Sequence, residues 1–246
     1  MRDHFRDEGV PMDFALFSNY ERQVEELLNG HIDIAWNTPL AHVRVQKRTN
    51  NTSLSLGMRD SDRDFSSRLI VRKDAKIHRL TDLLGKRLAV GSADSTQARI
   101  LPLYFLGQQG LDTSGVHIIP FDTDLGKHGD TGTSELDVLT ALMEGRADAG
   151  TIGELIWVLQ LAAGKIDSNI LESLWVSPPF DHCMFDALPI LEPAKIAGFE
   201  HALFAMHWEN PHHRPILEME GLKQWMPPRE SGYDSLRAAL SEFNRW

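Results

Sequence analysis

Two stretches of the chain, residues 27–35 and 142–150, repeat the same order of hydrophobic and polar positions. Each has the apolar end of a helix, a glycine, an aspartate nearby and a run of small or apolar residues. Glycine suits the left-handed position that commonly ends a helix, and an apolar run suits a strand buried in a parallel sheet. The repetition predicts two similar α/β halves, and a cleft between two such lobes is where a small ligand would bind.

The spacing of apolar positions along the rest of the chain predicts alternating helices and strands. Predicted helices cover residues 1–9, 20–28, 39–47, from 96 to about 109, 136–144, 153–161, 193 onward and 233–243. Predicted strands cover residues 14–17, 32–36, 53–58, 68–72, 87–90, 117–121, 147–151 and 170–176. This order is typical of an α/β fold with a mainly parallel sheet in each lobe. We expect residues 1–72 plus 182–246 to form the first lobe and residues 73–181 the second.

The composition of the chain argues against several classes of partner and site. The chain has 246 residues, 42% of them hydrophobic, which is enough for one large core or two smaller ones. Its net charge of −10 and the lack of a Lys/Arg cluster argue against a nucleic-acid partner. The single cysteine, Cys183, excludes a disulfide framework and any metal site built from several cysteines. We expect no membrane insertion, because no apolar run is long enough to span a bilayer.

The sharpest local signal is the segment 91–96, which follows the predicted strand 87–90 and begins a helix. Ser92, Ser95 and Thr96 place hydroxyl donors beside the free N–H groups of a helix start, a combination that favours an anion. The same residue types are preferred at an ordinary helix N-cap, and spacing alone favours that alternative. The Gly-Lys-Ser/Thr ending of a phosphate-binding loop is absent, and we predict no cofactor.

Four further candidates stand at the ends of predicted strands, namely Asn19, Tyr20, Trp36 and Asn37. Ligands of open α/β sheets bind beyond the carboxyl ends of strands, so these side chains are placed to line a cleft. The alternative is that Trp36 belongs to the core and Asn37 to a turn before a proline.

A Gly-rich loop, residues 125–132, carries His128 and Asp130, which either reach into a cleft or belong to a flexible surface loop. Together with Asp181, His182 and Cys183, they are residue types that bind zinc. No spacing among them is diagnostic, so we predict no metal site. Cys183 is expected to be a small packed residue, as free cysteines often are.

Taken together, these segments resemble the solute-binding proteins of phosphate, phosphite and phosphonate ABC transporters, which have a two-lobed type 2 periplasmic binding fold. The resembling segments are residues 17–21, 28–40, 90–95, 128–130 and 181–183. The resemblance implies ligand contacts for an aromatic residue, a hydroxyl-rich helix start, a histidine and two acidic residues: Tyr20, Ser92, Ser95, Thr96, His128, Glu154 and Asp181. Trp36 and Asn37 replace the second aromatic of the family pattern, which leaves the ligand open.

The function implied by this resemblance is capture of a small oxyanion between closing lobes, without chemistry, followed by docking on an ABC permease in the periplasm. Relative to the family pattern the chain begins at the first helix, so we expect the signal peptide and first strand to be missing and binding to be weakened. Two alternatives stay open. One is an enzyme on the same scaffold, with His128, Asp130, Asp181 and His182 as acid and base groups, and the other is a ligand-sensing domain.

Overall fold

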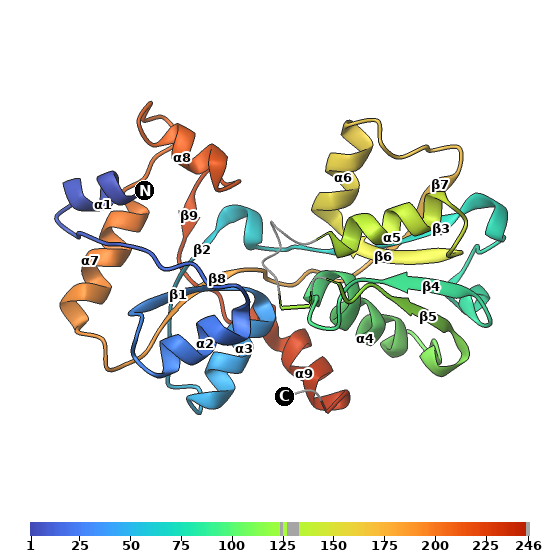
Figure 1. Cartoon of the computed structure of the whole chain (residues 1–246), viewed down its shortest axis with the longest axis horizontal. Coiled ribbons are helices and arrows are strands. Elements are labelled where there is room, and N and C mark those ends of the chain that lie inside the picture. The colour runs from blue at the N-terminus through green and yellow to red at the C-terminus, as the bar shows by residue number, and fades with distance from the viewer. Residues whose placement is uncertain (124, 127–132, 245–246) are drawn as a thin grey trace. The chain divides into compact units, whose positions relative to one another are not determined.

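The computed structural model describes residues 1–123, 125–126 and 133–244 (Figure 1). The chain divides into two compact units. Unit 1 is Met1–Asp64 with Asp181–Asp234, and unit 2 is Phe65–Phe180 with Ser235–Trp246. The boundaries expected from the sequence, 72/73 and 181/182, differ from these because residues 67–72 are hydrogen-bonded into the sheet of unit 2 and the last helix also belongs to unit 2.

Unit 1 contains helices on both sides of a four-stranded sheet. Its helices are α1 (Arg2–Asp7), α2 (Tyr20–Leu28), α3 (Pro39–Arg48), α7 (Pro193–Phe204) and α8 (Arg214–Met219). Its strands are β1 (Ile34–Asn37), β2 (Leu54–Arg59), β8 (Met184–Ala187) and β9 (Trp225–Met226), in the order β1-β8-β2-β9. Each pairing that the structure describes in this sheet is antiparallel.

The expectation of a mainly parallel sheet is therefore wrong for unit 1. β1, α3 and β2 form a crossover unit of the expected kind, but β8 lies between β1 and β2 and runs antiparallel to both. The predicted strand at residues 14–17 is also wrong. That segment has no regular secondary structure, and Phe14 and Leu16 are 62% and 88% exposed.

The two faces of the unit 1 sheet pack against different helices. On β1, Ala35 faces a cluster formed with α2 and α3, whereas Ile34 and Trp36 face the cluster around α7 and α8. This alternation is the two-residue period of a strand. The turn between α2 and β1 uses Gly30 at φ +72°, and Gly145 has the same value before the equivalent strand in unit 2, as the sequence repeat predicts.

Unit 2 has a mixed five-stranded sheet in the order β5-β4-β6-β3-β7. The strands are β3 (Ser67–Arg72), β4 (Arg87–Val90), β5 (His117–Pro120), β6 (Ala149–Gly153) and β7 (Leu171–Val176). β4 is parallel to β5 and β6, and β3 is antiparallel to β6 and β7. The helices are a π-helical turn (Thr96–Ile100) continued by α4 (Leu101–Gln108), then α5 (Ser134–Met143), α6 (Glu154–Ala162) and α9 (Asp234–Glu242).

Helices cover both faces of the unit 2 sheet. Leu69 and Val71 of β3 pack in the cluster that contains α4, and Ile70 between them packs in the cluster of α5 and α6. Figure 1 shows α4 on one side of this sheet and α5 and α6 on the other. A sheet buried on both faces explains the apolar strands of the sequence repeat. Within the residues described, no helix is long and apolar enough to cross a membrane.

A connected group of polar side chains in unit 1 is buried around Asp186 and His42, with the partly exposed Glu230 at its edge. The Asn37 amide donates to Asp186 Oδ2 at 2.8 Å, and His42 Nδ1 lies 2.8 Å from Asp186 Oδ1. Glu230 Oε2 lies 3.5 Å from His42 Nε2, and the ring of Tyr233 packs against the imidazole. Burial alone would lower the pKa of His42, but the two carboxylates raise it to about 9. The interior of unit 1 therefore stabilises the imidazolium form.

We expect the free energy of unfolding to decrease as the pH rises from about 6.5 to about 9. The folded-state pKa of His42 exceeds its unfolded value, so its stabilisation is complete below the unfolded pKa and is lost as the pH passes the folded one. The shift corresponds to on the order of 3 kcal/mol. Urea unfolding across this range measures it. His42→Gln should be less stable at the acidic end and have a smaller slope, with the remaining slope contributed by His182, whose pKa is also raised, while His31→Gln, on an exposed side chain, should leave the slope unchanged. An unchanged slope in His42→Gln would contradict the assignment.

A second buried carboxylate, Asp181, is held by an arginine. Arg229 donates to both carboxylate oxygens of Asp181, from Nε at 2.7 Å and from Nη2, and it also pairs with Asp64 at 2.8 Å. The backbone N–H of Asp64 donates to Asp181 Oδ1 at 3.2 Å. Asp181 is 1% exposed, so Arg229 supplies the counter-charge that its ionised form needs.

Arg229→Met should destabilise unit 1 strongly. The substitution keeps an apolar stem but leaves the Asp181 carboxylate buried without its counter-charge, which costs about 3 kcal/mol. Arg2→Met is the matched control, because Arg2 and Asp13 form a solvent-exposed ion pair of the kind that contributes little to stability. Urea unfolding of the two variants measures the difference in stability. Equal losses of unfolding free energy would show that the Asp181 carboxylate does not need Arg229 as its counter-charge.

Candidate ligand-binding site

The start of the 96–108 helix in unit 2 is built by a close approach between β4 and the helix. A Cβ atom on Gly91 would lie 2.7 Å from the Cβ of Ala98, so a side chain at position 91 would displace the helix. The Gly91 N–H donates to the Ala98 carbonyl at 3.1 Å, and Thr151 donates its hydroxyl to the same carbonyl at 2.7 Å. These bonds fix the first turn of the helix against the carboxyl end of β4.

The first turn of this helix offers neutral hydrogen-bond donors. Ser95 is the N-cap, and its hydroxyl accepts the Ala98 N–H at 3.1 Å. The geometry of a helix start leaves the N–H groups of Thr96 and Gln97 without an acceptor inside the helix. Thr96 is 2% exposed, and its hydroxyl has no hydrogen-bond partner among the residues described. A buried hydroxyl in this state is costly unless a ligand oxygen accepts from it.

The start of α5 lies beside the start of the 96–108 helix. Ser134, the first residue of α5, is buried, and its hydroxyl oxygen would lie 3.4 Å from a Cβ at Gly91. Each helix N-terminus carries a partial positive charge of about half an elementary charge, which favours anions. Two such ends at one position make this part of unit 2 suited to a small anion.

Two acidic side chains near this helix start form hydrogen bonds within unit 2. Asp122 Oδ1 accepts from the Ala93 N–H at 2.8 Å and from Arg99 at 2.9 Å, so an arginine offsets its charge. Asp94 Oδ2 accepts from the Gly126 N–H at 2.7 Å, whereas its buried Oδ1 has no partner among the described residues.

The sequence-based candidates in unit 1 have structural contacts of their own. Asn19 is the N-cap of α2 and accepts from the Arg22 N–H, and Tyr20 packs in the cluster of α2 and α3. Trp36 packs between Phe185 and Trp225, at ring distances of 4.3 and 5.7 Å. Asn37 is fully buried in the polar group around Asp186. Their expected role in ligand binding stays a prediction.

The remaining candidates are spread over both units. Asp181 pairs with Arg229 in unit 1, and Glu154 of unit 2 forms a two-point ion pair with Arg68. His128 and Asp130 lie outside the described residues. The structure therefore brings together Ser92, Ser95 and Thr96, and it adds Ser134, which the sequence analysis missed. The sequence pattern that could have identified Ser134 is a pair of hydroxyl residues followed by an apolar run, which is typical of a helix start.

His182 lies in unit 1 beside two other potential metal ligands, Asp62 and Cys183. Burial alone would lower the pKa of His182, but the neighbouring Cys183 and Asp62 raise it to about 10. Burial would raise the pKa of Asp62, and hydrogen bonds from His182 and Arg59 hold it at about 2. This group belongs to unit 1, and the helix start belongs to unit 2.

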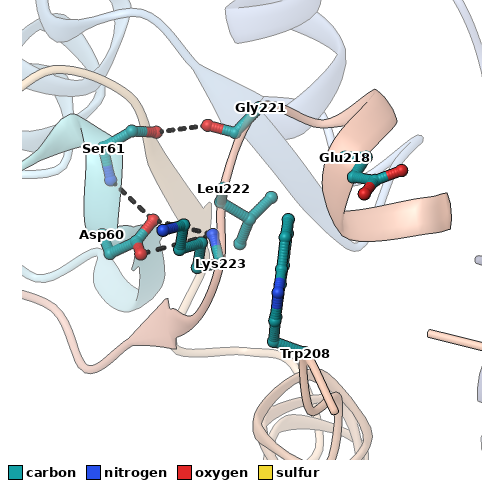
Figure 2. A pocket seen from close by; sticks show the side chains of 7 residues that line it. All are labelled: Asp60, Ser61, Trp208, Glu218, Gly221, Leu222 and Lys223. Carbon is teal, nitrogen blue, oxygen red and sulfur yellow. Dashed lines mark hydrogen bonds between the residues drawn. The ribbon is translucent and has the colours of Figure 1, made fainter. Parts of the chain in front are cut away.

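A pocket of about 490 Å³ in unit 1 has a different chemical character. Figure 2 shows Trp208 facing Leu222, with hydrogen bonds between the residues on the opposite wall. The Asp60 carboxylate accepts the N–H groups of Ser61 and Lys223 there. The wall residues are Asp60, Ser61, Trp208, Glu218, Gly221, Leu222 and Lys223. Two carboxylates and a ring already contacted by Lys223 make this pocket less suited to an anion than the helix start.

Comparisons with known proteins identify the family to which the chain belongs. Residues 3–233 match the family model described as "ABC transporter, phosphonate, periplasmic substrate-binding protein". A relative from Prochlorococcus marinus (strain MIT 9301), the probable ABC transporter phosphite binding protein PhnD1, is 24% identical over 237 residues, 92% of this chain and 77% of that protein.

Two solved structures have the same fold. PhnD1 from Prochlorococcus marinus (MIT 9301), in complex with methylphosphonate, has a TM-score of 0.77 at 21% identity, covering 100% of this chain and 91% of that chain. XAC2383 from Xanthomonas citri, bound to ATP, has a TM-score of 0.75 at 18% identity, covering 99% and 90%. These matches confirm the expected two-lobed periplasmic binding fold, and the family is one of transport proteins rather than enzymes. Because the family model spans nearly the whole sequence, the chain belongs to the periplasmic substrate-binding proteins of phosphonate ABC transporters.

Proposed function

We propose that this protein captures a small phosphorus oxyanion, of the phosphonate or phosphite class, at the start of the 96–108 helix. The observation that carries the proposal is the buried Thr96 hydroxyl, which has no partner among the described residues and lies where two helices begin. A ligand oxygen that accepts from this hydroxyl would remove the cost of burying it unpaired.

The donors at this position match the chemistry of an oxyanion. Phosphorus-bound oxygens are hydrogen-bond acceptors, and the helix start presents N–H groups and the hydroxyls of Ser92 and Thr96. Neutral donors and helix dipoles stabilise negative charge without burying an opposite unpaired charge.

The substrate class is supported by the relatives. PhnD1 is named as a probable phosphite-binding protein, and its solved structure contains methylphosphonate. Both ligands carry phosphorus-bound oxygens and a small substituent. We therefore propose that the hydroxyl-rich helix start binds the oxygens and that other residues select the substituent.

A binding protein of this family acts with a small ligand and with the permease of an ABC transporter. We propose that this chain delivers its oxyanion to such a permease and does so in the periplasm, which is the general location of the family. Its net charge of −10 is consistent with recognition through local donors rather than through a broad basic surface.

Thr96→Val should weaken oxyanion binding while leaving the ligand-free protein at least as stable as before. One lost hydrogen bond to a charged ligand is worth about 1.5–3 kcal/mol, so affinity should fall roughly tenfold or more. Without ligand, valine removes a buried hydroxyl that has no partner, which should not reduce stability. Calorimetric titration with phosphite and methylphosphonate measures the affinity, and thermal unfolding measures the stability.

Two further variants separate ligand binding from folding. Thr140→Val is the matched control, because the Thr140 hydroxyl is on the exposed side of α5 and bonds to the Leu136 carbonyl. Ser95→Ala should lose about 1 kcal/mol of stability, since it removes the N-cap. If Thr96→Val bound phosphite and methylphosphonate with unchanged affinity, the binding site would have to lie elsewhere in the chain. Lack of binding by the unmodified protein to phosphite, methylphosphonate, phosphate and a sulfonate would overturn the substrate class.

A further inference from the structure

Three different metal-ligand types converge in unit 1, whereas the proposed oxyanion site is built from residues of unit 2. His182 Nδ1 lies 3.1 Å from Cys183 Sγ and 3.5 Å from Asp62 Oδ1. The three potential ligand atoms all lie within 4.8 Å of one another. Asp62 is 1% exposed and Cys183 is 4% exposed, whereas the His182 side chain is 15% exposed. The group is thus mostly enclosed, with access from the side of the imidazole.

The two separations measured from His182 Nδ1 are close to those of a tetrahedral metal site, and the Asp62 and Cys183 ligand atoms lie within 4.8 Å of each other. Zinc binds sulfur at about 2.3 Å and nitrogen or oxygen at about 2.0–2.2 Å, so its ligand atoms lie roughly 3.3–3.7 Å apart. The distance from His182 Nδ1 to Asp62 Oδ1 is within this range, and the distance to Cys183 Sγ is shorter by a few tenths of an ångström. A small side-chain rotation would accommodate the ion.

The backbone around these residues is already held in place. The His182 N–H donates to the Asp62 carbonyl at 2.8 Å, and the Tyr233 hydroxyl donates to the His182 carbonyl at 2.8 Å. Tyr233 is fully buried. A site whose ligands are positioned before the metal arrives loses little conformational entropy on binding.

Arg59 has the geometry of an outer-sphere partner. It donates from Nε to Asp62 Oδ2 at 2.6 Å and from Nη2 to Asp62 Oδ1 at 2.9 Å. A carboxylate oxygen has a second lone pair, so Asp62 Oδ1 can accept from Arg59 and still face a cation. Hydrogen bonds to ligating carboxylates commonly orient them and adjust metal affinity.

We propose that Asp62, His182 and Cys183 bind one thiophilic divalent cation of the zinc class. The mixture of thiolate, imidazole and carboxylate favours zinc over magnesium or calcium, which prefer oxygen ligands. Three protein ligands leave a fourth position for water. The ion would join the segment just before the chain leaves unit 1, at Asp64, to the segment where it returns, at Asp181. The proposal does not depend on the oxyanion site.

Cobalt(II) tests this site directly, because it replaces zinc and gives an optical signal when a thiolate binds it. The protein has one cysteine, so a sulfur-to-metal charge-transfer band can come only from Cys183. We expect the metal-free protein to bind one equivalent of cobalt with this band, and zinc to displace it. Metal bound to the folded state should also raise the thermal unfolding midpoint.

Three variants identify the ligands. Cys183→Ser and Cys183→Ala should abolish the band, and Asp62→Asn should weaken cobalt binding roughly tenfold or more. Two cysteine variants are used because either one alone can affect packing, and circular dichroism confirms that each is folded. The control is His213→Ala, since His213 lies beside His207 and His4, in a separate group of histidines that can bind cobalt without sulfur. It should leave the band unchanged.

The alternative is a thiol that simply hydrogen-bonds to the imidazole. In that case cobalt gives no thiolate band, and Cys183→Ser binds metal as the unmodified protein does. Either result would overturn the proposal, as would a band that persists in folded Asp62→Asn with unchanged affinity. Since the readouts are spectroscopic and thermal, loss of oxyanion binding has no influence on them.

Discussion

The position of β8 is the constraint on which unit 1 depends. This strand lies between β1 and β2 and pairs with both, although it follows them by well over a hundred residues that form unit 2. The sheet of unit 1 is complete only when the chain has returned from unit 2. Pairings of such long sequence separation are slow to form, because the loop must close before any contact rewards it. The fold of unit 1 is thus set by a contact that no local segment contains.

The buried charges of unit 1 strengthen the same long-range connection. His42 pairs with Asp186 and Asp62 with His182, and the partly buried Arg229 also pairs with the exposed Asp64. Each pair joins a residue before position 65 to one after position 180. An isolated buried charge is strongly destabilising, so separating the two segments would leave several ionised groups without partners. These interactions therefore favour cooperative assembly of unit 1 over partly formed states.

The spacing of apolar residues predicted correctly those helices and strands that are determined by their own segment of the sequence. The helix at residues 20–28 and the strand at residues 87–90 agree with the structure in their bounds. β8 was missed because Asp186 interrupts a four-residue apolar run, and its burial makes sense only with His42 as a neighbour. Residues 14–17 form a short apolar run like that of a buried strand, but they lie outside both sheets. At the site, hydroxyl residues before a helix were visible in the sequence, whereas the approach of Ser134 to Gly91 depends on how α5 packs beside β4.

A buried polar side chain lies at the end of β1 in unit 1, and another follows β4 in unit 2, but the two differ in their hydrogen bonds. At the end of β1, the amide oxygen of Asn37 accepts from Gln23, and its N–H₂ donates to Asp186, so this polar side chain is satisfied inside the protein. At the end of β4, Thr96 is equally buried but its hydroxyl has no partner among the described residues. A folded protein retains such a group at the cost of some stability, and a ligand that accepts from it recovers that cost. Related strand–helix patterns in one chain thus give a polar core in unit 1 and an open donor set in unit 2. The difference lies in which hydrogen bonds the surrounding fold completes, and motif spacing does not encode it.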